Sequence, residues 1–427
     1  MTCLWIIGGG IEAVPSVRRA REMGLFVVVA DGNPAAPAFG LADAAVVVST
    51  YDEAGMAERA AAFSARERRV DGVFAASADV PRTVAAVAEA LSLPGISRAT
   101  AHLAADKLAM KRHLRAAGIA VPDFWAVESA GALRACFGPA GGRLVIKPVD
   151  SRGARGVLQL RPDSDLDWAF AHARAQSPTG RVMAEAFVAG PQFSTESVLI
   201  GGEARTPAVI DRNYARLEQF APFMIEDGGT QPSFLPAAAL EPVMRLAEAA
   251  GRALGIGTGT VKGDLVLGAG GPVVIEMAAR VSGGWMATDQ IPLHSGVDFI
   301  GIAIRLALGE TVEIAEAEPK AGQATAIRYF FPPPGLARAV AADPVLTVQP
   351  WVRRFSLDLA PGDRVPPVTD HTRRAGFVLV TGADRAEAVA RAEAVIAGTR
   401  IEVVPEARGT TVPEARGTGV AGEGEGG

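Results

Sequence analysis

The sequence predicts a multidomain α/β protein whose first region is a parallel sheet. Four short apolar runs alternate with helical patterns over residues 1–100, and such runs favour strands that helices cover on both faces. The runs are LWIIGG from Leu4, LFVVVAD from Leu25, and residues 44–49 and 71–76. Two later patterns, an acidic hairpin and a Gly-rich loop between strands, indicate a further α/β region. A length of 427 residues allows two to four domains.

The remaining elements follow in chain order. Helical patterns are expected up to Met23, over 55–68, and over 101–121 with an end at Gly118. Later in the chain, helices are expected over 241–254 and 385–397, and strands at ATAIRYFF and GFVLVTG. Two copies of VPEARGT and a final GEGEGG have little to bury, so residues 406–427 are expected to form a disordered tail.

The acidic hairpin is the most informative pattern. The segment VKGDLVLGAGGPVVIEMAARVSGG reads as two apolar strands joined by a Gly-rich turn over 267–272. Asp264 lies on the first strand and Glu276 on the second, so pairing of the strands brings both carboxylates to one point. Arg280 follows four residues after Glu276, and Lys262 shares a strand face with Asp264 because side chains alternate. Two carboxylates suit Mg²⁺, and an Arg can hold a phosphate.

A second pattern, LVIKPVDSRGARGVLQL, places Lys147 on a strand before a loop that contains Gly153 and Gly156. Glycines allow backbone N–H groups to approach phosphate oxygens closely, although the motif is not a P-loop. Downstream, Glu185 precedes an apolar turn to Val188 and a Gly–Pro corner. The Glu185 carboxylate could accept a hydrogen bond from an adenine amino group.

Lysine usage supports these assignments. Only five of the 42 basic residues are Lys, which leaves 37 Arg. The five are Lys107, Lys111, Lys147, Lys262 and Lys320. Since Lys is a compact charge that Arg does not replace sterically, its retention in the candidate motifs favours function.

Five motifs in this order resemble the ATP-grasp superfamily: ADKLAMKRHL, the Lys147 loop, AEAFVAG, VKGD and IEMAAR. The resemblance covers about residues 1–310, and IEMAARVSGG resembles enzymes that ligate the carboxylate of an amino acid to an amine. It implies ATP and Mg²⁺ (or Mn²⁺) as cofactors, an acyl phosphate intermediate, and ADP and phosphate as products. The implied roles are phosphate binding by Lys107 and Lys147, adenine binding by Glu185 and Val188, metal binding by Asp264 and Glu276, and stabilisation of the acyl phosphate by Arg280.

Two positions depart from the family pattern. Ala278 stands where many members have Asn as a metal ligand, which leaves the second metal's ligand set open. Gln192 stands where many members have a Glu for the ribose hydroxyls, and it can still form a hydrogen bond.

The resemblance also implies an ATP-grasp domain plan. The expected segments are a Rossmann-like domain (1–100), a helical connector (101–121), a lid (122–190), a larger half with the metal site (191–319), a smaller C-terminal α+β domain (320–405) and the tail (406–427).

Three alternatives remain open from the sequence. Gly8, Gly10 and Ala13 follow a strand, and Asp31 ends the next one, which fits the dinucleotide fingerprint of an NAD-dependent oxidoreductase. That reading leaves the Lys147 loop and the acidic hairpin unexplained. A non-catalytic nucleotide sensor is the second alternative, and a ligase of nucleotide biosynthesis that uses bicarbonate or a ribonucleotide is the third.

Composition excludes some classes of partner. A net charge of −5 without a basic block argues against nucleic acid, and two distant cysteines imply neither a disulfide framework nor a zinc site. No apolar stretch reaches about 18 residues, and the start lacks a signal-peptide pattern, so a cytoplasmic location is expected and no membrane partner. The expected partners are small-molecule carboxylate and amine substrates, and a homodimer is left open.

Overall fold

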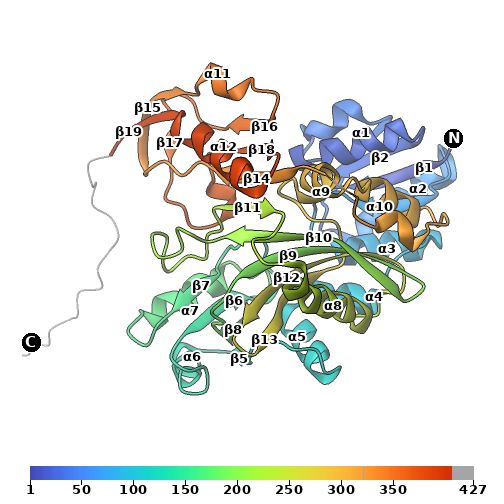
Figure 1. Cartoon of the computed structure of the whole chain (residues 1–427). Helices are drawn as coiled ribbons and strands as arrows, with labels where there is room; N and C mark the ends of the chain where they lie inside the picture. Colours follow the sequence, from blue (N-terminus) through green and yellow to red (C-terminus); the bar gives the residue numbers. More distant parts are fainter. Residues whose placement is uncertain (321, 406–427) are drawn as a thin grey trace, which may run out of the picture.

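A computed structural model describes residues 1–320 and 322–405 and shows an α/β protein built on four sheets. Figure 1 shows the N-terminal sheet and the C-terminal region on one side of a long central sheet, with the lid at the opposite end. The expected disordered tail at 406–427 lies outside the described residues.

The predicted parallel sheet is confirmed, with strand order β3-β2-β1-β4. All five residues of β1 are buried, as expected for a strand covered on both faces. The strands are β1 (Cys3–Ile7), β2 (Phe26–Asp31), β3 (Ala44–Val47) and β4 (Gly72–Ala75), and the helices are α1 (Val14–Glu22), α2 (Glu53–Arg66) and α3 (Pro81–Leu91).

The core of this first region also contains a distant part of the chain. Phe299, Ile300 and Ile304 pack in one buried cluster with Leu4 and Val27. Their helix, α10 (Phe299–Ala307), follows α9 (Ile291–Ser295), and both lie beside the N-terminal sheet in Figure 1. Residues that follow the acidic hairpin therefore help to hold the N-terminal sheet in place.

The connector consists of two helices rather than one, α4 (Arg98–Ala105) and α5 (Lys107–Ala116). Asp106 separates them because its side chain caps the second helix, accepting a 2.9 Å hydrogen bond from the backbone N–H of Ala109.

The lid follows as an antiparallel sheet of order β5-β8-β6-β7. Its elements are β5 (Phe124–Val127), α6 (Ala130–Ala135), β6 (Leu144–Pro148), β7 (Leu158–Leu160), α7 (Leu166–Ala175) and β8 (Val182–Ala186).

The central sheet has eight strands in the order β13-β12-β9-β10-β11-β14-β18-β16. It runs across position 320, so the division of the chain at 319/320 remains a proposal. Its strands are β9 (Gln192–Ile200), β10 (Glu203–Asn213), β11 (Gly228–Gln231), β12 (Gly259–Gly268), β13 (Gly271–Ala278), β14 (Ala324–Tyr329), β16 (Val352–Leu357) and β18 (Gly376–Gly382).

Helices α8 (Ala237–Ala253) and α12 (Arg385–Ala397) complete the larger elements. The start of α8 lies four residues before the predicted one, because Ala237–Leu240 are strong helix formers that extend the first turn ahead of Pro242. The short helix α11 packs against α12 and β16, and a small sheet has the order β17-β15-β19. These elements are β15 (Gly335–Ala341), α11 (Pro344–Thr347), β17 (Arg364–Val365) and β19 (Arg400–Val404).

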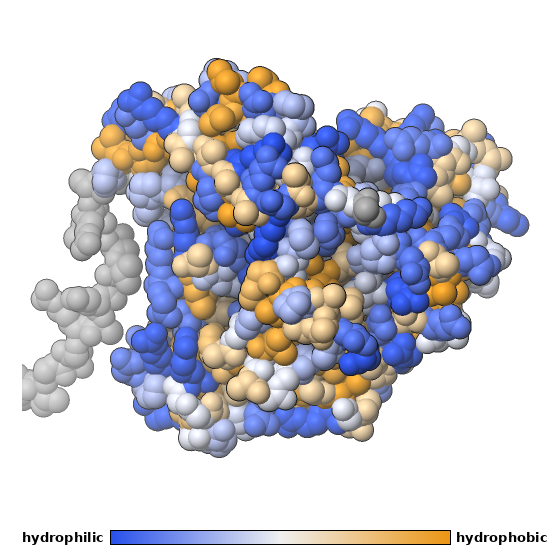
Figure 2. All heavy atoms as spheres, in the orientation of Figure 1, coloured by the Kyte–Doolittle hydropathy of each residue, from blue (hydrophilic) through white to orange (hydrophobic). Residues whose placement is uncertain are grey.

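The visible surface mixes polar and apolar residues. Figure 2 shows an apolar patch at the top, over α11, where Val345 and Val348 are exposed. Within the described part of the chain, every helix is too short or too polar to cross a bilayer.

Candidate active site

The lid, the central sheet, the N-terminal region and the C-terminal region together enclose a cavity of about 630 Å³. The predicted site residues that line it are Lys107, Lys147, Gly153, Glu185, Val188, Gln192, Lys262, Asp264, Glu276 and Arg280. Gly156 lies in the same loop but not on the cavity wall. Residues far apart in the sequence thus converge on one space, as the order of motifs predicts.

The two carboxylates lie opposite each other on the hairpin of β12 and β13. Asp264 pairs in register with Glu276, and the register then shifts so that Ile275 is the extra residue of a bulge. A bulge re-aims the side chains next to it. Both carboxylates face the cavity as a result.

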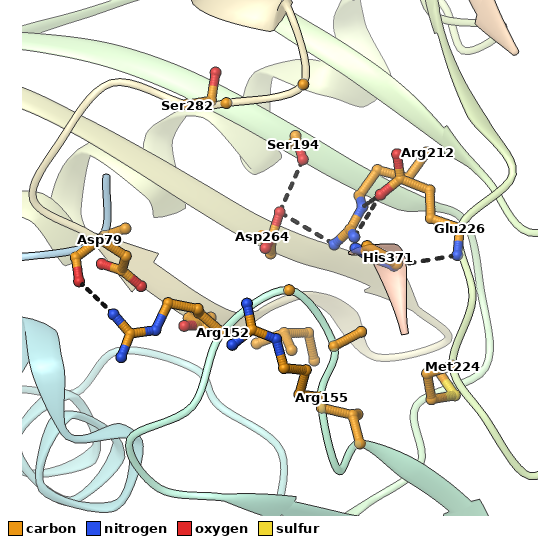
Figure 3. A pocket seen from close by; sticks show the side chains of 18 of the residues that line it. Asp79, Arg152, Arg155, Ser194, Arg212, Met224, Glu226, Asp264, Ser282 and His371 are labelled. Atoms are coloured by element: carbon orange, nitrogen blue, oxygen red, sulfur yellow. Dashed lines mark hydrogen bonds and ion pairs between the residues drawn. The ribbon is translucent and has the colours of Figure 1, made fainter. Parts of the chain in front are cut away.

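Three groups hold Asp264. Lys262 Nζ lies 2.5 Å from Oδ2, Ser194 Oγ donates to Oδ1 at 2.8 Å, and Arg212 lies 3.1 Å from Oδ1. Figure 3 shows Ser194 and Arg212 meeting at this carboxylate. Burial acts to raise the pKa of Asp264, but the charges of Arg212 and Lys262 outweigh it and hold the pKa well below its usual range. Asp264 is therefore ionised at neutral pH.

Glu276 binds Lys107, with 3.0 Å between Oε1 and Nζ. The same ammonium donates to the carbonyl of Ser151 at 2.6 Å and so connects the hairpin with the Gly-rich loop. Burial acts to lower the pKa of Lys107, but Glu276 and Asp79 outweigh it and raise the pKa. This cation therefore stays charged.

Glu185 lies between two lysines deep in the site. Its Oε1 is 2.6 Å from Lys147 Nζ and its Oε2 is 2.8 Å from Lys111 Nζ, and all three side chains are buried. A carboxylate can accept further hydrogen bonds, so contact with adenine remains a proposal. Burial lowers the pKa of Lys111 to about 8, against the opposing charge of Glu185. Lys111 was not among the predicted site residues, although the scarcity of lysine could have identified it.

The Gly-rich loop contacts both terminal regions of the chain. The Arg152 guanidinium donates to the carbonyl of Asp79 at 3.2 Å, and the backbone N–H of His371 donates to the carbonyl of Gly153 at 3.1 Å. Gly156 has φ +72°, and a Cβ there would lie 2.9 Å from Pro148 Cγ and from Gln176 Cβ. Glycine at 156 thus permits the shape of the loop.

Arg280 pairs with Asp79 across the cavity, at 3.3 Å between Nε and Oδ1. Burial acts to raise the pKa of Asp79, but Arg280 and Lys107 outweigh it and lower the pKa. Asp79 lies in the loop between β4 and α3, where no sequence motif marks it. Its position shows that the N-terminal region completes the site.

Two further carboxylates hold the turn after Arg280. Glu196 Oε1 accepts a 2.8 Å hydrogen bond from the N–H of Ser282, and Glu12 Oε2 accepts a 3.0 Å bond from the N–H of Gly284. Glu196 is 1% exposed, its Oε2 has no hydrogen-bond partner among the described residues, and burial raises its pKa to about 7.

Glu196→Gln tests this environment through the pH dependence of stability. Because folding raises the pKa of Glu196 from 4.5 to about 7, its stabilising contribution is present below pH 4.5 and is lost as the pH rises through 7. The free energy of unfolding of the wild type should fall by about 3 kcal/mol relative to that of the variant between pH 4.5 and 8. Urea unfolding across that range measures the difference, and parallel pH profiles would contradict it.

A further wall of the cavity, formed by the ends of β10 and β14 and by the segments before β11 and β18, was not predicted. Arg212 pairs with Glu226 at 2.5 Å, and the Arg374 guanidinium lies 3.6 Å from the centre of the Tyr329 ring. Figure 3 shows His371 beside Arg212 and Glu226. These residues come from strand ends and loops without a local pattern, so no sequence signal marks them.

In the loop that fits the dinucleotide fingerprint, the Asp31 carboxylate already accepts hydrogen bonds from the backbone of this chain. Asp31 Oδ2 accepts a 2.7 Å hydrogen bond from the N–H of Gly9, and Oδ1 accepts a 2.8 Å bond from the N–H of Asn33. An NAD ribose would need that carboxylate, and a pyrophosphate would need the loop amide. This geometry disfavours the oxidoreductase alternative.

Known families match two parts of the chain. The ATP-grasp domain family matches residues 104–284, and the family described as L-amino acid ligase C-terminal domain 2 matches residues 328–404. The first range contains all of the predicted site residues, and the second contains His371 and Arg374.

Similar proteins cover nearly the whole chain. The crystal structure of an L-amino acid ligase from Bacillus licheniformis has a TM-score of 0.79 and 22% identity, covering 95% of this chain and 99% of that one. A formate-dependent phosphoribosylglycinamide formyltransferase of Burkholderia thailandensis is 27% identical, covering 93% of this chain and 95% of the relative. The uncharacterized protein y4rH of Sinorhizobium fredii is 25% identical, covering 89% and 77%. The chain therefore contains an ATP-grasp domain and a C-terminal domain of the L-amino acid ligase type.

Proposed function

We propose that the protein is an ATP-dependent, ADP-forming ligase that joins the carboxylate of an amino acid or related small metabolite to an amine. The observation that carries this proposal is the convergence of the Asp264/Glu276 pair, Arg280 and Lys107 in one cavity. The C-terminal domain that closes the cavity matches L-amino acid ligases.

ATP would lie between the lid and the central sheet. Lys107 and Lys147 would supply charge for its phosphates, while Glu185 and Val188 would hold the adenine. Gln192 would bind the ribose, and Gly153 would allow the loop amides to approach the phosphates.

The donor set of Asp264 and Glu276 fits Mg²⁺ or Mn²⁺. Both groups are carboxylates on one face of the hairpin, and each already pairs with a cationic side chain. When bound with ATP, the ion would neutralise charge on the phosphates. Within the described residues, no cluster of three or more His, Cys, Asp or Glu side chains is found, so the nucleotide would supply further ligands.

The reaction then has two steps. A carboxylate oxygen attacks the γ-phosphorus and the bond to ADP breaks. The amine nitrogen next attacks the acyl carbon, the bond to phosphate breaks, and the amine loses a proton. Arg280 stabilises the negative charge of the acyl phosphate, and Lys262 keeps Asp264 ionised. Closure of the loop over 151–156 excludes water that would hydrolyse the intermediate.

A ligase acting on a ribonucleotide is the second candidate, because the formyltransferase relative matches almost the full length of the chain. A homodimer, a cytoplasmic location and the six-segment division of the chain are further parts of the proposal. The two candidates differ in their substrates, so one screen separates them.

The screen measures ADP and phosphate release with Mg²⁺ and ATP over amino acids, singly and in pairs, and over ribonucleotide amines with formate or bicarbonate. Release with amino acids and an amide product in mass spectrometry support the first candidate. Release only with a ribonucleotide supports the second. AMP and pyrophosphate as products would contradict both.

A further inference from the structure

Arg374 differs from the other basic residues of the cavity in its origin and its contacts. It lies between β17 and β18, in the range that matches the L-amino acid ligase C-terminal domain. Its guanidinium stacks on Tyr329, and one N–H donates to the backbone carbonyl of Glu226 at 2.6 Å. The Glu226 carboxylate itself is bound by Arg212. In the described part of the chain, no carboxylate forms an ion pair with Arg374.

A guanidinium that lines the cavity without an ion-pair partner among the described residues can bind an anion. Its Nε is buried without a hydrogen-bond partner among the described residues, and burying a charge without a counter-ion is unfavourable. The Tyr329 ring and the Glu226 carbonyl fix the plane of the fork. A fixed fork of N–H donors fits the oxygens of a carboxylate or a phosphate.

The position of Arg374 distinguishes these two anions. Lys107 and Lys147, which we propose for the ATP phosphates, line the cavity from the connector and the lid together with Arg152. The ring beneath Arg374 instead borders the turn after Arg280, since a Cβ on Gly284 would lie 3.5 Å from the Tyr329 hydroxyl. The anion at Arg374 is therefore part of the second substrate rather than of the nucleotide.

The neighbouring wall is aromatic. Trp285 stacks on Phe377 with 5.3 Å between ring centres and 26° between planes, and Tyr329 lies 6.4 Å from the same Phe377 ring. All three residues line the cavity. A substrate anchored at Arg374 would place an apolar side chain against this wall.

We infer that Arg374 binds the free α-carboxylate of the amine substrate, so that this substrate is an α-amino acid with an apolar side chain. The inference rests on the proposed ligase function, because only a ligase has an amine substrate. Binding at Arg374 can nevertheless be measured without turnover. It makes Arg374 a specificity residue contributed by the C-terminal domain.

The test compares the wild type, Arg374→Gln and the control Arg373→Gln, whose side chain is 52% exposed and outside the cavity lining. Calorimetry with a non-hydrolysable ATP analogue and Mg²⁺ measures binding of L-leucine and L-phenylalanine against their amides. The wild type and the control should prefer the free acids by at least about tenfold, equivalent to about 1.4 kcal/mol. Arg374→Gln should lose that preference while its thermal unfolding midpoint stays near that of the wild type.

Two results would overturn the inference. One is that the wild type binds the free acids no better than the amides, or that Arg374→Gln keeps the same preference for the free acids as the wild type. The other is a rise in the KM for ATP of Arg374→Gln with no change for the amine, which would place a phosphate at this side chain. If the free acids bind in a way that depends on Arg374 but no ADP is formed, the carboxylate site at Arg374 is supported and the proposed ligase function is rejected. The two proposals can therefore fail separately.

Discussion

Glu276→Gln is expected to lower kcat by about 10³-fold, because the carboxylate proposed to hold the metal ion loses its charge. ATP should still bind, about tenfold more weakly, since Lys147 and the Val188 hinge do not depend on Glu276. The loss should appear in kcat rather than in the KM of the amino acid. Steady-state ADP release and nucleotide calorimetry measure the two effects.

The matched control is Glu58→Gln, an exposed glutamate outside the cavity lining, which should retain wild-type kcat. In Glu276→Gln, Lys107 loses its ion pair but keeps its hydrogen bond to the Ser151 carbonyl. We therefore expect the variant to fold, and urea unfolding checks this. A Glu276→Gln enzyme within about tenfold of the wild type, roughly 1.4 kcal/mol of barrier, would show that this carboxylate is no metal ligand in the reaction.

Arg280→Gln should lower kcat by about 10² to 10³-fold, since Arg280 is the cation proposed to stabilise the acyl phosphate. Arg280→Lys should recover only part of the activity, because an ammonium keeps the charge but not the planar fork. Asp79 would lose its partner at 3.3 Å, so the thermal midpoint of each variant must be measured alongside kcat.

Arg338→Gln serves as the control for this pair, because Arg338 is exposed on β15 and lies outside the cavity lining. Equal activity of Arg280→Gln and Arg338→Gln, with both proteins folded, would remove Arg280 from the mechanism.

The features predicted from sequence are those that local patterns encode. The register that brings Asp264 opposite Glu276 follows from one hairpin, and α12 and β18 have the predicted bounds because their periodicity is unbroken. The bulge at Ile275 left no sequence signal, although it lies next to the Asp264/Glu276 pair.

The features that were missed depend on contacts between distant segments. Asp79 and Glu12 reach the cavity from loops of the N-terminal sheet, and Arg374 reaches it from beyond the ATP-grasp motifs. The packing of α10 in the N-terminal core and the sheet that runs across position 320 are likewise tertiary. Hydrophobic periodicity says that such elements exist but not which surface each one covers.

The transfer of oxygen from substrate to phosphate tests the proposed chemistry most directly. The enzyme is supplied with Mg²⁺, ATP and the amino acid found active in the screen, labelled with ¹⁸O in its carboxylate, and the released phosphate is analysed by mass spectrometry. An acyl phosphate intermediate requires that one labelled oxygen from each amide-forming carboxylate appears in inorganic phosphate, with ADP as the other product. Unlabelled phosphate, or label in AMP with release of pyrophosphate, would contradict the proposed mechanism.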